Sequence, residues 1–497
     1  MRYNTFMYIP EILRNISEAL KSEGGRAVIV GGSVRDYFLK IPIKDYDIEV
    51  YGLVSISELE DILSKFGSVN LVGKSFGVLK FVHEGEEYDF SFPRLEEKTG
   101  KGHRGFHVVT DGKMEFKEAA RRRDFTINAM GYDIENGMFL DPFNGRRDME
   151  LKLLKHIDKN SFVEDPLRVY RAVQFAARFG YRLADETEKL CREMVESGML
   201  EELPKERVYS EVKKLLLKAD RPSVGFELMR RLGITGHYFP ELHALIGVPQ
   251  DVKWHPEGDV WTHTMLSLDC MSRELGVGNE KSGMKEKQKL KLLLAVLCHD
   301  LGKPLTTTVE LENGETFNWI SSQRSTLSAQ RFARIRAIGH EKAGLEPTRT
   351  FLYRLTDEHD FIESILPLVE HHLKPSQFYS QGAKAAAIRR LATKVNIEEL
   401  VLVAKADYFG RMKNGREKME SGDVYAAGVW LLEKAKDLKV ENKPLECLVQ
   451  GRDLIALGLE PSPEFKTILN EVYDLQLEGR FRNREEALSY IDEKYIK

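Results

Sequence analysis

One stretch near the N-terminus constrains the fold more than any other: residues 27–49, AVIVGGSVRDYFLKIPIKDYDIE. Its opening apolar run predicts a short buried strand, the Gly-Gly pair predicts a turn, and the residues that follow predict a helix. A second strand is expected over residues 44–51, and it carries Asp45 and Asp47. Because side chains alternate along a strand, these two carboxylates should project from one face of the sheet.

Two acids on one face, beside a glycine turn and a helix N-terminus, can hold a divalent metal against a phosphate chain. Alone, the Gly-Gly pair is usually just a tight turn, and an Asp-x-Asp pair is usually just a solvated face. Their order and close spacing favour a functional site. GGSVRD followed by KDYDIE resembles the signature of the nucleotidyltransferase superfamily, and more narrowly the bacterial-type (class II) tRNA nucleotidyltransferases and their poly(A) polymerase relatives. The resemblance implies that Asp45 and Asp47 bind two Mg²⁺ ions and that Gly31, Gly32 and Arg35 cradle phosphates.

Composition limits the alternatives. A chain of 497 residues should hold several domains with real cores. Its formal net charge of −4 argues against bulk electrostatic binding to long nucleic acid, so no DNA partner is expected. The four cysteines are far apart and form no CxxC, which is typical of reduced thiols in a cytoplasmic protein. No apolar run approaches the roughly 20 residues needed to span a membrane.

The rest of the head, residues 1–150, reads as a small mixed α/β domain. A helix is expected over 55–66 and strands over 76–82 and 87–92. Asp89 lies between aromatic residues on the last of these, either as a polar residue of an edge strand or as a third carboxylate beside the Asp-x-Asp pair. In relatives of the superfamily such an acid can activate the attacking hydroxyl.

Residues 96–117 are rich in Gly and Lys, lack periodicity and predict a mobile loop. The segment resembles the flexible loop of CCA-adding enzymes, which is needed for the adenosine step. Three consecutive arginines follow; such a run is usually a solvated basic face, but RRRDFTINA is similar to a family motif that places Arg123 on the incoming nucleotide. A hairpin is expected at Asn136-Gly137.

A helical neck is expected over residues 151–240. EDPLRVYR opens a helix there, and its acid and arginines could form a capping ion pair or read a base, because aspartate only accepts and arginine only donates hydrogen bonds. The segment resembles the EDxxR motif of class II enzymes, which implies that Asp165 and Arg168 select the base and that Arg171 serves the nucleotide site. Gln174 departs from the family pattern, because many relatives have an arginine there.

Two further neck and tail features carry structural expectations. Arg207 and Glu211 lie one helical turn apart and predict an ion pair. Residues 416–497 predict a helical C-terminal module that caps the chain or holds the tRNA.

Residues 241–415 predict a helical domain rich in histidine and aspartate. VWTHT, CHDLGK, GHEKAG, VEHH and AKADYFGR resemble the successive motifs of HD-domain phosphohydrolases. By that resemblance the metal ligands are His263, His299, Asp300 and Asp407. His340 and His372 would serve a second metal or the substrate phosphate, with His371 as the alternative to His372. Mixed imidazole and carboxylate ligands suit Ni, Mn, Fe or Zn.

An Asn-Gly pair within residues 306–322 predicts a hairpin inserted in this domain, to which no function is assigned.

The whole chain therefore predicts an α+β protein: a nucleotidyltransferase head, a helical neck, an HD-type helical domain and a helical tail. The resemblance implies template-independent addition of CCA to tRNA from CTP and ATP, with a metal-dependent 2′,3′-cyclic phosphodiesterase or phosphatase activity in the HD domain. The alternatives are an A-adding enzyme or poly(A) polymerase and, from a different class, mainly an HD phosphohydrolase. The sequence leaves the oligomeric state open.

Overall fold

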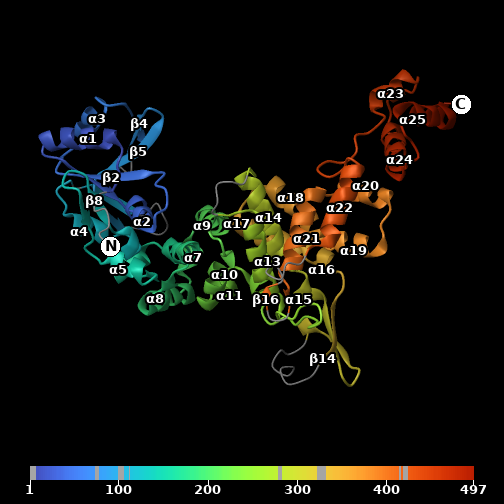
Figure 1. Cartoon of the computed structure of the whole chain (residues 1–497), viewed down its shortest axis with the longest axis horizontal. Coiled ribbons are helices and arrows are strands. Elements are labelled where there is room, and N and C mark those ends of the chain that lie inside the picture. The colour runs from blue at the N-terminus through green and yellow to red at the C-terminus, as the bar shows by residue number, and fades with distance from the viewer. Residues whose placement is uncertain are drawn as a thin grey trace. The chain divides into compact units, whose positions relative to one another are not determined.

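The computed structural model of the chain describes residues 7–72, 78–98, 106–110, 112–277, 283–321, 332–413, 416–417 and 424–496. The chain divides into two compact units (Figure 1). Unit 1 comprises Met1–Leu215 and Val224–His237, and unit 2 comprises Leu216–Ser223 and Tyr238–Lys497. The α+β class is confirmed, since unit 1 holds a mixed sheet with helices and unit 2 is mainly helical. The finer division into four domains stays a prediction.

A seven-stranded sheet forms the head of unit 1, with the strand order β3-β4-β5-β2-β1-β8-β9. β2 and β5 run parallel, and all other neighbours are antiparallel. The strands are β1 (Arg26–Val30), β2 (Tyr46–Tyr51), β3 (Ser68–Val72), β4 (Val78–His83), β5 (Glu86–Ser91), β8 (Gly131–Asp133) and β9 (Met138–Leu140). On β2, Ile48 and Val50 are buried whereas Asp47 is exposed, so alternation turns the acidic side chain away from the core.

The elements expected around the sheet are present. α2 (Gly32–Leu39) follows β1 directly. α3 (Ile56–Leu63) begins at a capping box in which Ser55 and Glu58 each accept a backbone N–H hydrogen bond. The hairpin between β8 and β9 turns at Gly137, whose φ of 65° suits glycine.

The expected mobile loop over 96–117 is corrected in part. Residues 94–98 form β6 (Arg94–Lys98), which pairs antiparallel with β7 (Phe106–Thr110). The loop's end lies in α4 (Phe116–Arg121), whose Phe116 and Ala120 are buried against the sheet. Residues 99–105 and 111 lie outside the described residues. The strands were missed because they are short and flank a Gly- and Lys-rich stretch without periodicity.

Short helices continue unit 1 after the sheet. Residue 165 falls in a break: α6 ends at Glu164 and α7 begins at Leu167, so the helix expected to open at residue 164 opens three residues later. Arg207 pairs with Asp165 rather than with Glu211, which accepts from Lys214. The remaining helices between residues 11 and 238 are α1 (Glu11–Ser22), α5 (Gly145–Glu150), α6 (Lys159–Glu164), α7 (Leu167–Phe179), α8 (Asp185–Glu196), α9 (Lys205–Lys218), α10 (Pro222–Arg231) and α11 (Ile234–Tyr238).

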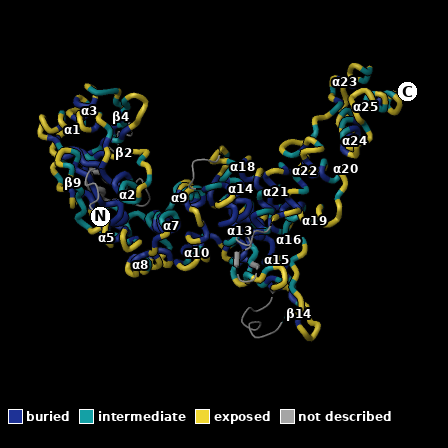
Figure 2. Tube along the Cα trace, viewed as in Figure 1, coloured by how far each residue is buried: buried dark blue, intermediate teal, exposed yellow. Residues whose placement is uncertain are grey.

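Unit 2 is built around one helix that is apolar on nearly every side. α14 (Glu286–Cys298) buries the run LLLAVLC, and its contacts with α13, α18 and α21 make it the centre of the domain, as the dark core in Figure 2 shows. The surrounding helices are α12 (Pro240–His243), α13 (Val260–Glu274), α15 (Lys303–Thr306), α16 (His340–Ala343), α17 (Leu345–Leu355), α18 (His359–His371), α19 (Lys374–Gln381), α20 (Ala385–Ala392), α21 (Ile397–Phe409) and α22 (Ala426–Asp437).

A small antiparallel sheet interrupts these helices. The expected hairpin is confirmed as β12 (Thr307–Leu311) and β13 (Thr316–Asn318), and a third strand, β14 (Phe332–Ala337), pairs with the other side of β12. The C-terminal helices α23 (Gly451–Ala456), α24 (Glu464–Glu478) and α25 (Arg484–Ile491) form a small cluster with its own apolar core. None of the helices in the described part of the chain has the length and apolarity that a bilayer crossing requires.

Candidate active sites

The turn between β1 and α2 depends on glycine. Gly31 has φ 70° and ψ −126°, a conformation that L side chains rarely adopt. A Cβ atom there would lie 2.9 Å from a guanidinium nitrogen of Arg123 and 3.9 Å from a carboxylate oxygen of Asp47. The absent side chain therefore lets the glycine turn, an arginine and a carboxylate approach one another closely.

Three carboxylates gather beside this turn. Asp47 on β2 lies directly opposite Asp89 on the parallel strand β5. Asp45 lies one residue before β2 and is exposed. Although Asp47 is exposed as a residue, partial desolvation of its carboxyl group, followed by the negative charges of Asp89 and Asp45, raises its pKa, and Arg123 opposes the change. A divalent cation would relieve this repulsion, so the donor set fits a hard ion with oxygen ligands.

The arginines near the turn are already paired. Arg123 donates to Glu49 at 2.6 Å and to the carbonyl of Asn128 at 3.2 Å. Arg35 is buried and donates to Asp36 and to Asn128, with its guanidinium over the ring of Phe179. Arg35 thus ties α2 to the rest of unit 1 while still lining the cavity.

The acid and arginines of the neck are held by a separate network. Arg168 donates to the carbonyls of Ser161 and Arg122 at 2.7 and 2.6 Å. Asp165 accepts from the backbone N–H of Leu167 and from Arg207 at 3.0 Å. These contacts restrain both side chains through neighbouring backbone groups and Arg207.

Unlike Arg168, which donates to backbone carbonyls, Arg171 pairs with a carboxylate. Two of its nitrogens donate to Asp124, at 2.6 and 2.7 Å. Although burial opposes ionisation, Arg171 and the Asn128 hydrogen bond lower the pKa of Asp124. Gln174 is buried, and its amide nitrogen has no hydrogen-bond partner among the described residues.

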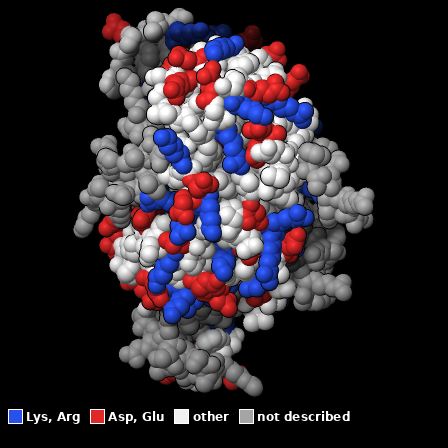
Figure 3. Space-filling view, turned by 90° about the vertical axis from the view of Figure 1, so that its left-hand side faces the viewer, with Lys and Arg blue, Asp and Glu red and all other residues white. Residues whose placement is uncertain are grey.

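These groups line one cavity of about 400 Å³ in unit 1. Its walls include the glycine turn, one acid of β2, and the neck acid and arginines, namely Gly31, Gly32, Arg35, Asp47, Arg123, Asp124, Asn128, Asp165, Leu167, Arg168, Arg171 and Arg207. Asp45 and Asp89 are not among the lining residues. Acidic and basic side chains are interspersed over the described residues of the face shown in Figure 3, as the near-neutral net charge leads one to expect.

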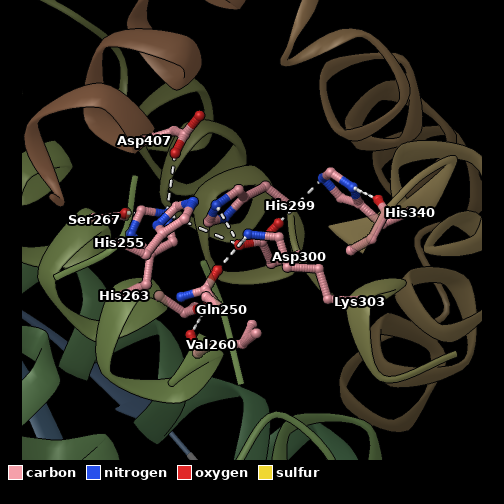
Figure 4. Close-up of polar contacts among 12 residues, drawn as sticks. Gln250, His255, Val260, His263, Ser267, His299, Asp300, Lys303, His340 and Asp407 are labelled. Atoms are coloured by element: carbon pink, nitrogen blue, oxygen red, sulfur yellow. Dashed lines mark hydrogen bonds and ion pairs between the residues drawn. The ribbon is translucent and has the colours of Figure 1, made fainter. Parts of the chain in front are cut away.

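The second site lies in unit 2, where ends of five helices converge (Figure 4). His263 on α13, and His299 and Asp300 just after α14, offer ligand atoms that all lie within 4.8 Å of one another. Asp407 on α21 lies 3.0 Å from Nε2 of His263. Although burial opposes ionisation, the neighbouring cations hold the pKa values of Asp300 and Asp407 well below the usual range.

A second group of potential metal ligands also includes Asp300. The Oδ2 atom of Asp300 lies 3.2 Å from Nε2 of His299, and its Oδ1 atom lies 3.4 Å from Nε2 of His340. His372 completes the group, with its Nε2 3.3 Å from that of His340. His371 lies outside both groups and is near Glu370, so His372 is the one that faces the cluster.

Several cluster residues were missed by sequence reasoning. Glu257 is fully buried and accepts from Nδ1 of both His255 and His263. Lys303 lies 2.7 Å from Asp300 and donates to Gln250 at 2.6 Å. Arg411 reaches Asp407 from one turn further along the chain. The HDLGK spacing, three residues from Asp300 to Lys303, was the available signal for the lysine; the Glu257 and Gln250 contacts exist only in the folded chain.

The chain comes unusually close to itself beside this cluster. A Cβ at Gly302 would lie 2.0 Å from the carbonyl oxygen of His340 and 2.5 Å from the nitrogen of Gly344. Glycine at this position therefore permits α16, with His340 at its start, to approach Asp300.

The donors of this cluster fit a transition metal. Nε2 of His299 and Oδ1 of Asp300 are buried and have no hydrogen-bond partner among the described residues. Buried polar atoms are normally satisfied, because an unsatisfied one costs about 1–3 kcal/mol. Each of the backbone-anchored histidines His299, His340 and His372 uses Nδ1 on a carbonyl, which turns Nε2 inward.

Comparison with known proteins identifies the family to which the chain belongs. The chain is 35% identical over 393 residues to the multifunctional CCA protein of Pseudoalteromonas atlantica, covering 77% of this chain and 85% of that protein. It is 32% identical over 450 residues to that of Acinetobacter baumannii strain ATCC 17978, covering 88% and 97%. The chain belongs to the multifunctional CCA protein family.

Three family models match in chain order. "Poly A polymerase head domain" matches residues 27–155, "Probable RNA and SrmB- binding site of polymerase A" matches 180–246, and "HD domain" matches 261–412. The head and HD domains imply dependence on divalent metal.

Solved structures share the fold. The Thermotoga maritima CCA-adding enzyme complexed with tRNA aligns with a TM-score of 0.58 at 20% identity, covering 97% of this chain and 95% of that one. The Bacillus stearothermophilus CCA-adding enzyme in complex with CTP aligns with a TM-score of 0.62 at 19% identity, covering 98% of each.

Proposed function

We propose that this chain is a cytoplasmic enzyme that builds and repairs the 3′-terminal CCA of tRNA from CTP and ATP. One observation carries the proposal: the glycine turn, Asp47 and the Asp165–Arg168 pair line a single cavity in unit 1. Phosphate-binding, metal-binding and base-reading groups thus face the same volume. The membership of the multifunctional CCA family supports CCA addition over a poly(A) polymerase or an A-adding enzyme.

In this proposal the tRNA 3′-oxygen attacks the α-phosphorus of the nucleotide, and the bond from that phosphorus to the β-phosphate oxygen breaks, releasing pyrophosphate. Mg²⁺ held by Asp45 and Asp47 would supply neutralising charge for the triphosphate and acidify the hydroxyl. Asp89, opposite Asp47, is placed to take the proton of that hydroxyl. Arg123 would leave Glu49 for the phosphates, whose bidentate geometry its guanidinium suits.

Base selection would fall to Asp165 and Arg168. The first offers acceptors and the second donors, so together they complement the exocyclic groups and ring nitrogens of cytosine and, with a small shift, of adenine. Their backbone anchors keep this pattern fixed without a nucleic-acid template.

An incorporation assay tests this function. Three tRNA transcripts, ending before CCA, after C and after CC, are given Mg²⁺ with CTP, ATP or both. Addition of C, C and A in turn, followed by arrest, is the expected result. Addition of A only to the CC-ended tRNA would indicate an A-adding enzyme, and a long A tract would indicate a poly(A) polymerase.

A second activity is supported by the unsatisfied atoms of the unit 2 cluster. We propose that it hydrolyses 2′,3′-cyclic phosphodiesters or phosphomonoesters, with water adding to phosphorus, one ester bond breaking, and the leaving ribose oxygen taking a proton. His263, His299, Asp300 and Asp407 would hold Ni, Mn, Fe or Zn, and His340 and His372 a second ion or the phosphate. Such ions supply an activated water and Lewis-acid charge. Hydrolysis of adenosine 2′,3′-cyclic phosphate that a chelator abolishes and metal restores tests the activity.

A further inference from the structure

The metal-ligand cluster of unit 2 opens into a cavity of about 270 Å³. This is near the lower end of the roughly 300–1,000 Å³ typical of small-molecule sites. One wall carries the cluster residues Asp300, His340 and Asp407. The lining also includes residues outside the candidate metal-ligand groups, among them Trp254 and Arg336.

Trp254 is unusual among the tryptophans of this chain. It is 59% exposed, whereas Trp261 is 1% and Trp319 is 7% exposed. Aromatic side chains are among the groups that predominantly line small-molecule pockets, and Trp254 combines this position with an exposed ring. The Nζ atom of Lys253 lies 5.4 Å from the centre of that ring.

The backbone that carries Trp254 is anchored in a turn next to the metal-ligand cluster. The backbone N–H groups of Trp254 and His255 both donate to the carbonyl of Asp251, at 3.0 and 2.8 Å. The next side chain, His255, contacts Glu257, which in turn orients His263. Trp254 is therefore tied through a short turn to the residues that surround the reacting phosphate.

The inserted sheet supplies part of the same cavity. Thr307 on β12 and Ile335, Arg336 and Ala337 on β14 all line it. Arg336 is exposed, so its guanidinium adds positive charge for a phosphate at the cavity mouth. The predicted hairpin contributes only Thr307, and the third strand, β14, supplies the other sheet residues of this wall.

We propose that Trp254 is the residue on which the base of a substrate nucleotide stacks while its ribose phosphate occupies the metal cluster. The ligand class is a nucleoside 2′-phosphate or 2′,3′-cyclic phosphate, either free or at the 3′ end of RNA. Every base has a π-face, so stacking gives tolerance of sequence and selects nucleotides over base-free phosphoesters. The proposal rests on the proposed phosphohydrolase activity and names a specificity residue for it.

Hydrolysis kinetics of the full-length, Zn²⁺-loaded protein provide the first test. Substrates are adenosine 2′-monophosphate, a trinucleotide RNA ending in a 2′,3′-cyclic phosphate, and base-free glycerol 2-phosphate. Trp254→Ala should raise the KM for the nucleotide substrates by roughly 5- to 100-fold, the range for loss of one base–aromatic stack. The preference for nucleotide over glycerol 2-phosphate should fall accordingly, and Trp254→Phe should restore most of it.

Intrinsic fluorescence provides a second readout that does not depend on turnover. Adenosine 2′-monophosphate should quench the indole emission of the wild type, glycerol 2-phosphate should not, and the nucleotide-dependent quench should vanish in Trp254→Phe. Val252→Ala is the matched control, because Val252 is 74% exposed, lies two residues away and does not line the cavity.

The outcomes show whether the stacked base belongs to a free nucleotide or to the 3′ end of RNA, or they contradict the proposal. A raised KM for both nucleotide substrates fits a site that accepts free nucleotides as well as RNA ends. A raised KM for the RNA alone fits a terminal base of RNA. An unchanged KM for both in Trp254→Ala, with the quench retained in Trp254→Phe, overturns the assignment. If no variant or wild type hydrolyses any substrate while the Trp254-dependent quench persists, the proposed activity fails and the stacking assignment stands.

Discussion

The two sites of this chain hold their charges in opposite ways. In unit 1 the arginines of the cavity already have partners, as Arg123 has Glu49 and Arg171 has Asp124. In unit 2 the carboxylate of Asp300 is ion-paired with Lys303, but its Oδ1 and Nε2 of His299 form no hydrogen bond with a described residue. The charges of the first cavity are therefore neutralised and hydrogen-bonded by neighbouring side chains. In the second, an ion bound at the two unpartnered atoms would offset the cost of burying them.

The largest effect that separates the two sites is expected from removing the carboxylate of Asp47. Asp47→Ala should lower nucleotide addition by at least about 1,000-fold, because metal stabilisation of a phosphoryl-transfer transition state is worth several kcal/mol. Single-turnover incorporation into a CC-ended tRNA measures it. Phosphoester hydrolysis in unit 2 should be unaffected and serves as the folding control. Surviving addition would remove Asp47 from the metal site.

Asp300→Asn is the reciprocal change in unit 2. It removes the carboxylate shared by both ligand groups, so phosphoester hydrolysis should fall at least about 100-fold while CCA addition persists. Metal content by elemental analysis should fall with it. Unchanged metal content would mean that the unsatisfied atoms of Asp300 and His299 do not ligate an ion.

Glu257→Gln should have a smaller effect on the same site. Glu257 fixes the tautomer of His263 by accepting from Nδ1, and the loss of such a partner typically weakens metal affinity 10- to 100-fold. Competition with a chromogenic chelator measures the affinity. The exposed Glu315→Gln, on the inserted hairpin, is a matched control for the charge change. Equal affinity in Glu257→Gln and the wild type would make Glu257 a packing residue only.

Arg168→Lys should produce the smallest change. Lysine keeps the charge but cannot hold two carbonyls and a base with one planar group. The ratio of CTP to UTP incorporation should fall about tenfold, the worth of one charged hydrogen bond. Misincorporation on a transcript ending before CCA gives the ratio. If the ratio holds, base selection lies elsewhere in the cavity.

Features whose residues lie close together in the sequence could be predicted from it. The first strand, the Gly-Gly turn and Asp47 follow one another within 25 residues, and local geometry orders them, whereas Asp45, expected on the same strand as Asp47, lies one residue before β2. His299-Asp300 at the end of an apolar helix is of the same kind. These signals need no knowledge of the rest of the fold.

Features that depend on packing between distant parts of the chain could not be predicted from the sequence. Arg207 has a suitable acid one turn away in Glu211, yet it reaches 42 residues along the chain to Asp165. His371 and His372 are adjacent at the end of α18, and only the direction in which that helix ends relative to α16 separates them. β6 and β7 lack a period that pattern reasoning can detect, and they form because each satisfies the other's backbone.

The contact at Gly302 has a consequence for how many metals unit 2 can hold. The distance from Asp300 to His340 is set by how closely two backbone segments approach, and one hydrogen atom in place of a methyl group sets that approach. A larger residue at position 302 would collide with the backbone of His340 and Gly344, so His340 would have to move away from Asp300. If the cluster holds two ions as proposed, a residue that contacts neither ion would then decide whether the second one binds.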